Sequence, residues 1–202
     1  MDPRPPARVS RRAIALGAIV LALGAMPSAY MWVSARAFPP DTTPEGAYLR
    51  VVLAISENRV ASAFAYLETE AQWSLFSLHD YERRAYDLVE QSYPEPERAR
   101  LLAQYRAAHE SRDAEQLFAR LAESRGWTAR LRKDLSGVGQ VEIQGERATV
   151  QTARGTRYPV RKRDNGIWGL TLFTAELRSD AQRAARDFAV VERAAADYRA
   201  AK

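Results

Sequence analysis

The stretch that decides the fold is residues 137–172, which read GVGQVEIQGERATVQTARGTRYPVRKRDNGIWGLTL. Apolar and polar residues alternate within it, which is the spacing of strands that bury one face. The alternating apolar positions form four groups, which are Val141/Ile143, Ala148/Val150, Tyr158/Val160 and Trp168/Leu170/Leu172. Glycines separate the groups, and the pair Asn165-Gly166 favours a tight hairpin turn. We therefore expect four strands joined by short turns, in an antiparallel meander.

Helical spacing of apolar residues appears on both sides of this meander. Ahead of it, three residues are candidate N-caps of helices, namely Thr43, Asp80 and Asp113. Three apolar residues of the same region are expected in the core, namely Trp73, Phe76 and Leu78. Behind the meander, one helix is expected over residues 175–200. Because helices precede and follow an unbroken set of strands, the fold class is α+β.

The expected C-terminal helix carries an apolar seam with the spacing of heptads. The seam residues are Leu177, Ala181, Ala184, Phe188, Val191, Ala195 and Tyr198. Alanine occupies three of these positions, which leaves little apolar surface for an isolated coiled coil. We therefore expect this helix to pack against the domain itself, and the alternative is self-association or a partner helix.

The N-terminal segment predicts where the protein resides. Residues 13–33 carry no charge, and about 20 such residues cross the hydrocarbon core of a bilayer as a helix. Four arginines precede the run, so its N-terminal side is expected in the cytoplasm. We expect a single-pass inner-membrane protein with a cytoplasmic basic tail at 1–12, a transmembrane anchor at 13–33, a Pro-rich spacer at 34–43 and a periplasmic domain at 44–202.

The alternative is a signal segment that is removed after export. Ala35-Arg36-Ala37 places small residues at the spacing that signal peptidase reads, and Pro27 could end the helix early. Cleavage there would leave a secreted or periplasmic domain that begins near Phe38. In both cases the domain acts outside the cytoplasm.

Three segments of the domain resemble the nuclear-transport-factor-2-like superfamily, whose fold is the cystatin-like cone. They are a helix, turn and short helix over 48–67, the turn and strand over 145–150, and the Asn-Gly hairpin with its tryptophan over 164–170. The resemblance covers residues 44–173 and implies a cone-like α+β domain, to which the C-terminal helix is an addition. The whole also looks like membrane-anchored members of this group in bacterial envelopes. Members include isomerases, cyclases and dehydratases, and also many non-catalytic binders.

The charge distribution argues against a nucleic-acid-binding protein. Beyond residue 37 the chain has 25 basic and 24 acidic side chains, which is too balanced to neutralise a phosphate backbone. Residues 125–163 are nevertheless basic, with ten basic and three acidic side chains. Arg157, Arg161 and Arg163 have the spacing of one strand face, so we expect a binding face for an acidic envelope protein or anionic headgroups. The alternative is that carboxylates of the helical part neutralise these arginines within the fold.

Five aromatic residues are candidates for lining a pocket in the cone, namely Tyr48, Trp73, Tyr81, Tyr158 and Trp168. Core packing is the alternative for each of them. The two histidines, His79 and His109, lack metal-ligand spacing, and the carboxylates around Glu82 have the spacing of solvated helix ion pairs. The sequence therefore predicts no catalytic residue, no metal site and no cofactor.

These observations favour a non-catalytic, membrane-anchored envelope module that binds a protein partner or a small ligand. The alternative is a cone-pocket enzyme of the isomerase or hydratase type. A filled cone with an exposed basic face favours the binding module. A buried polar cavity that holds a carboxylate or histidine with a shifted pKa favours the enzyme.

Overall fold

The computed structural model describes residues 38–201, of which residues 39–201 belong to one compact unit. The predicted basic tail and transmembrane anchor, residues 1–33, lie outside the described residues. Among the residues that the structure describes, no helix is both long enough and apolar enough to cross a membrane. The fold of the compact unit is α+β, with a four-stranded antiparallel sheet and a C-terminal helix, which confirms this part of the prediction.

The sheet is a meander with the strand order β1-β2-β3-β4. The strands are β1 (Val138–Gln144), β2 (Arg147–Thr152), β3 (Arg157–Lys162) and β4 (Trp168–Leu170). Each strand pairs antiparallel with the next one, as the alternation of apolar residues predicts. Its inner face is the buried one, because Ala148, Val150, Tyr158 and Val160 are all 6% exposed or less.

Two of the predicted inward positions do not join the core. Ile143 is 59% exposed, because it lies at the end of the edge strand β1, next to the turn at Gly145. Leu172 is 37% exposed, because β4 ends at Leu170 and the alternation ends with it. The fourth strand is therefore shorter than its apolar pattern predicts.

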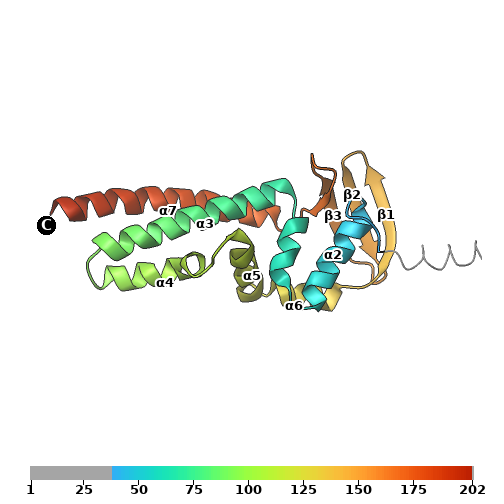
Figure 1. Ribbon diagram of the computed structural model, residues 1–202, viewed down its shortest axis with the longest axis horizontal. Helices are drawn as coiled ribbons and strands as arrows, with labels where there is room; N and C mark the ends of the chain where they lie inside the picture. The colour runs from blue at the N-terminus through green and yellow to red at the C-terminus, as the bar shows by residue number, and fades with distance from the viewer. Residues whose placement is uncertain (1–37, 202) are drawn as a thin grey trace, which may run out of the picture. The chain divides into compact units, whose positions relative to one another are not determined.

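Helices cover the inner face of the sheet and fill the space beneath it. They are α2 (Pro44–Ser56), the 3₁₀-helix η1 (Val60–Tyr66), α5 (Ala114–Ser124) and α6 (Trp127–Asp134). Figure 1 shows α2 lying against the sheet. Thr43 caps α2, because its Oγ1 accepts a hydrogen bond from the N–H of Gly46 at 3.2 Å, and Asp113 caps α5 in the same way. The core between these layers includes Tyr48, Phe64, Phe118, Trp127 and Trp168.

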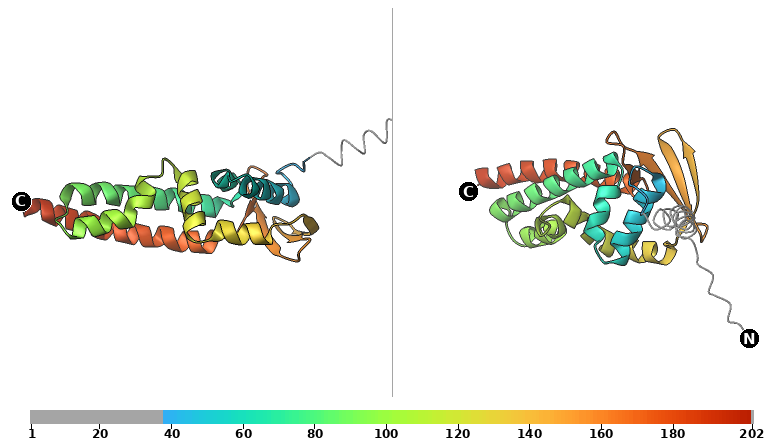
Figure 2. Two further views of the ribbon diagram at one scale, coloured as in Figure 1. Left: turned by 90° about the horizontal axis from the view of Figure 1, so that it is seen from below. Right: turned by 45° about the vertical axis from the view of Figure 1, so that its right-hand side comes forward.

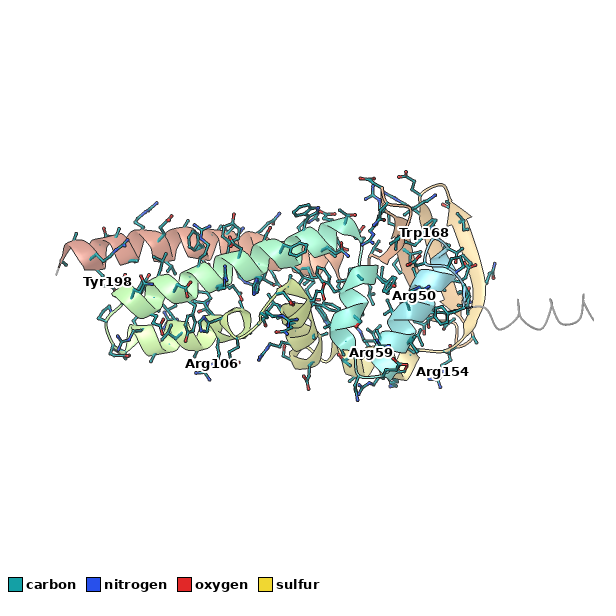
Figure 3. The ribbon with its side chains drawn as sticks, viewed as in Figure 1. Arg50, Arg59, Arg106, Arg154, Trp168 and Tyr198 are labelled. Carbon is teal, nitrogen blue, oxygen red and sulfur yellow. The ribbon has the colours of Figure 1, made fainter. Side chains whose placement is uncertain are left out.

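Three helices extend away from the sheet and form what we call the arm. They are α3 (Thr69–Ser92), α4 (Glu97–His109) and α7 (Thr174–Ala200). Both views in Figure 2 show α7 running beside α3. The arm has its own apolar clusters, and Tyr198 lies near its far end, where its hydroxyl donates to Glu97 at 2.9 Å (Figure 3).

The apolar seam of α7 is covered by the other helices of the arm. Phe188, Val191 and Ala195 cluster with residues of α3 and α4, and the ring of Tyr81 lies 5.7 Å from that of Phe188. Ala181 and Ala184 cluster with Leu78 and other residues of the same unit. The helix therefore packs against its own domain, as its alanine-rich seam indicates.

The helical region differs from the prediction in several features. Of the three residues of α3 expected in the core, Leu78 is buried, but Trp73 is 67% and Phe76 48% exposed. Asp80 does not begin a helix, because it lies inside α3, which continues for 24 residues until Tyr93 and Pro94. No glycine or proline interrupts this stretch, and Leu75, Leu78, Ala85 and Val89 keep one buried stripe along it. Helix α6 was not predicted. It starts at Trp127, and its N-cap Gly126, with a left-handed φ of 69°, directly follows Arg125, the C-cap of α5.

Candidate functional site

The outer face of the sheet, opposite to α2, carries the candidate site. Helix α3 begins on this side because the chain passes closely over β4. Glu68 donates its backbone N–H to the carbonyl of Leu170 at 3.0 Å, and Leu67 forms a parallel bridge with Leu170. A Cβ atom on Gly169 would lie 2.6 Å from the Cα of Glu68, so the close approach requires glycine at this position.

A groove lies between the start of α3 and the outer face of the sheet. Its first part has a volume of about 520 Å³, with Glu68 and Glu70 on the α3 side and charged residues of β1, β2 and β3 on the other. Its second part has a volume of about 360 Å³, shares Glu68, Glu70 and Arg161, and extends to Trp73 and Arg163. We call the two parts together the sheet groove.

The sheet groove is mixed in charge rather than positive throughout. Five basic and five acidic side chains line it. Two ion pairs involve these side chains. Arg157 lies 3.0 Å from Glu142, and Glu70 lies 3.0 Å from Arg178 of α7, which is outside the groove. Arg157 is therefore neutralised by Glu142 of β1, across the intervening strand β2, and not by the helical part of the chain.

Within the described residues, Arg157 is the only basic residue of the groove that forms an ion pair. Arg147 and Arg161 differ from the other basic residues because they lie directly opposite each other on β2 and β3, and both are exposed. Neither has an ion pair with any residue of the described part of the chain within 4.0 Å. Like charges that face each other across a ladder destabilise the sheet, so this pair leaves a local site for an anion.

Arg163, the third predicted arginine, lies just beyond the end of β3. Its Nη1 donates to the carbonyl of Leu67 at 3.3 Å, and burial lowers the pKa of its guanidinium. Its buried Nε has no hydrogen-bond partner within residues 38–201. The three predicted arginines therefore line one continuous groove, with Arg163 held at its end rather than on the open face.

The aromatic candidates do not form one pocket. Tyr48 and Tyr158 meet beneath the sheet with their ring centroids 5.1 Å apart, and Tyr48 donates to the carbonyl of Ser136 at 2.9 Å. Burial and the neighbouring Tyr48 raise the pKa of Tyr158 to about 12, so its hydroxyl stays neutral at ordinary pH. These rings fill the core, and neither lines the sheet groove.

The other three aromatic candidates are dispersed. Trp168 is buried, and its Nε1 donates to the carbonyl of Thr42 at 3.1 Å (Figure 3). Tyr81 packs on Phe188 within the arm. Trp73 is 67% exposed, because it is on the face of α3 opposite the buried Leu75 and Leu78, and it is the one that reaches the sheet groove.

A buried charge cluster at the base of the arm was missed by the sequence reasoning. Asp180 of α7 is 5% exposed and lies 2.6 Å from Arg125 and 2.5 Å from Arg183. Glu82 of α3 lies close to this cluster. Burial and the charge of Asp180 raise the pKa of Glu82 to about 7, so the expectation of a solvated ion pair is wrong for this residue.

The described residues hold no group of three or more histidine, aspartate and glutamate side chains arranged for a metal ion. His79 faces the carbonyl of Ser111 through its Nε2 at 2.8 Å. His109 stacks on Tyr86 with 3.7 Å between the ring centroids. Both histidines therefore have structural contacts in the helices, away from the sheet groove.

The chain matches no family model, no curated protein and no solved structure. What the sheet groove can bind therefore has to follow from its own geometry. That geometry depends on pairings that sequence spacing did not indicate, above all the one that places Arg147 opposite Arg161. The closest signal in the sequence is the short loop with Gly155 between β2 and β3, since loop length fixes the register of a hairpin.

Proposed function

We propose that this protein is a non-catalytic, membrane-anchored envelope module, whose sheet groove binds an acidic, extended segment of a protein partner. The observation that carries the proposal is the facing pair Arg147 and Arg161, which lacks an acidic partner within residues 38–201. A carboxylate between two guanidinium groups accepts charge-assisted hydrogen bonds from both, which are stronger than neutral ones. Binding would thus relieve a repulsion that the free domain carries.

The charge balance of the groove supports a polypeptide partner over a bilayer surface. Anionic headgroups attract clusters of basic residues, each contributing about 1 kcal/mol. Here five acidic side chains offset five basic ones, so a flat anionic surface gains little. A polypeptide segment can place single carboxylates on Arg147 and Arg161 while it avoids Glu68 and Glu142.

The filled core supports a binding module over the alternative enzyme. The space between the sheet and α2 is occupied by large side chains such as Tyr48, Tyr158 and Trp168, each 4% exposed or less. Glu82 has the shifted pKa of a candidate acid, but it lies at the base of the arm among Asp180, Arg183 and Arg125 and lines none of the sheet groove. The proposal therefore assigns no catalytic residue.

The location of the module is part of the proposal. The uncharged run 13–33 with arginines on one side supports an inner-membrane anchor with the domain in the periplasm. The segments over 48–67, 145–150 and 164–170 support membership of the nuclear-transport-factor-2-like superfamily. An envelope protein with an exposed acidic segment is then the partner.

Binding of a labelled oligoglutamate peptide to the full-length chain in non-ionic detergent tests the proposal. Fluorescence anisotropy at low ionic strength is suitable, because salt screens such contacts. The double variant Arg147→Gln, Arg161→Gln should bind at least about tenfold more weakly, which corresponds to 1.4 kcal/mol. The matched control is Arg83→Gln, Arg193→Gln, which removes the same charge from exposed positions of the arm.

The control should bind like the unchanged protein. Equal weakening in both double variants would reduce the effect to net charge and would contradict the proposed site. Stronger binding to phosphatidylglycerol vesicles than to the peptide, with the same dependence on Arg147 and Arg161, would replace the protein partner by a membrane surface.

A further inference from the structure

Trp73 is far more exposed than the other tryptophans of the described residues. Trp127 and Trp168 are each 4% exposed, whereas Trp73 is 67% exposed on the regular helix α3. Phe76, one turn further along the same helix, is 48% exposed. Adjacent exposed aromatic side chains on a rigid element mark interaction sites more often than isolated ones do.

The two exposed rings are held in place by the core. Trp73 contacts Phe76 edge to face at 6.0 Å between ring centroids, and Phe76 contacts the buried Phe64 in the same way at 5.5 Å. Phe64 is 5% exposed and belongs to the core beneath the sheet. A ligand that packs on Trp73 therefore meets a ring that is already ordered, which lowers the entropic cost of binding.

Trp73 also lies at the end of the sheet groove. Trp73 lines the same part of the groove as Arg161, Lys162 and Arg163. Arg163 is half-buried there, has an unpartnered Nε and donates one hydrogen bond, to the carbonyl of Leu67. Tryptophan and arginine are enriched among the few residues that contribute most of the binding energy in protein interfaces.

We infer that the partner segment alternates acidic and apolar residues, and that one of its apolar side chains packs on Trp73 and Phe76 while its carboxylates bind the arginines of the groove. The inference rests on the proposed function, because it extends the same site along α3. An extended segment presents successive side chains on opposite sides. Acidic and apolar groups at alternate positions can thus reach the arginines of the sheet and the rings of α3 at once.

Acrylamide quenching of tryptophan fluorescence reports directly on this contact. In the full-length variant Trp32→Phe, Trp73 is the exposed tryptophan of the described residues, while Trp127 and Trp168 are buried. Two probes are compared, an oligoglutamate peptide and a peptide in which glutamate alternates with leucine at the same total charge. The alternating peptide should bind about tenfold more tightly and should protect Trp73 from acrylamide.

The variants separate this inference from the proposed function. Trp73→Ala should remove the advantage of the alternating peptide, so that this variant binds the two probes with the same affinity. Equal affinity for both probes, with Trp73 still open to acrylamide, would overturn the inference and leave the binding groove in place. If the unchanged protein binds neither probe, this result would overturn the proposed function itself. Protection of Trp73 by phosphatidylglycerol vesicles in the absence of peptide would overturn the inference in favour of membrane contact.

Discussion

Replacement of Glu82 by glutamine should stabilise the protein at alkaline pH. Glu82 of α3 lies close to Asp180 and Asp187, and burial together with these charges raises its pKa from 4.5 to about 7. Arg183 and Arg125 oppose the shift without cancelling it. The folded chain therefore holds a proton on Glu82 that the unfolded chain releases, and the ionised side chain costs folding free energy.

The size of the effect follows from the pKa shift. One pKa unit corresponds to about 1.36 kcal/mol, so a rise from 4.5 to about 7 corresponds to about 3 kcal/mol. Partial access of solvent to Glu82 screens the charge, so the expected cost of ionising Glu82 in the folded chain is lowered to roughly 2 kcal/mol. Linkage fixes the sign of the pH dependence of stability. Because the folded state binds more protons than the unfolded state, the free energy of unfolding falls as pH rises from about 4.5 through about 7.

Urea unfolding at pH 5 and at pH 8, followed by circular dichroism of the full-length chain in non-ionic detergent, measures this effect. Glu82→Gln should equal the unchanged protein near pH 5 and exceed it by roughly 2 kcal/mol at pH 8. The matched control is Glu90→Gln, which alters an exposed carboxylate of the same helix. A variant that is less stable than the unchanged protein at pH 8, or one whose unfolding free energy depends on pH as steeply as that of the unchanged protein, would refute the reasoning.

Two further substitutions and one fractionation experiment test the core, the groove and the anchor. Trp168→Ala should lower the unfolding free energy by about 3–5 kcal/mol in the same urea assay, because its ring is 4% exposed and its Nε1 is hydrogen-bonded; a loss below about 1 kcal/mol would contradict the burial. Gly169→Ala should cost about 1–3 kcal/mol and weaken oligoglutamate binding, since its Cβ would meet the backbone of Glu68. The run 13–33 predicts that carbonate-washed membranes retain the full-length chain, and a soluble chain that starts near Phe38 would show cleavage instead.

The sheet could be predicted from the sequence because its signals are local. Alternation over two residues and the turn at Asn165-Gly166 depend on near neighbours, and they place all four strands in the right order. The N-caps Thr43 and Asp113 are local as well, and both are found as predicted. Asp80 shows the limit of such signals, because the buried stripe of α3 outweighs the capping tendency of a single residue.

The site depended on contacts between distant residues. The approach of Glu68 to Gly169 joins segments about a hundred positions apart, and without it the sheet groove has no wall. The facing pair Arg147 and Arg161 requires the exact register of β2 on β3, which composition does not supply. Exposure is also a tertiary property, so the apolar pattern predicts Trp73 in the core although α3 buries its other face.

The arm has the geometry of a lever. Helix α7 continues for twenty residues beyond Asp180, from 181 to 200, and a helix rises about 1.5 Å per residue, so about 30 Å of it extends past the buried charge cluster. A tilt of about 10° at that point would displace the region of Tyr198 by about 5 Å. Small adjustments around Glu82 and Asp180 would therefore be magnified at the far end of the arm, where the ring of Tyr198 packs on that of Tyr93.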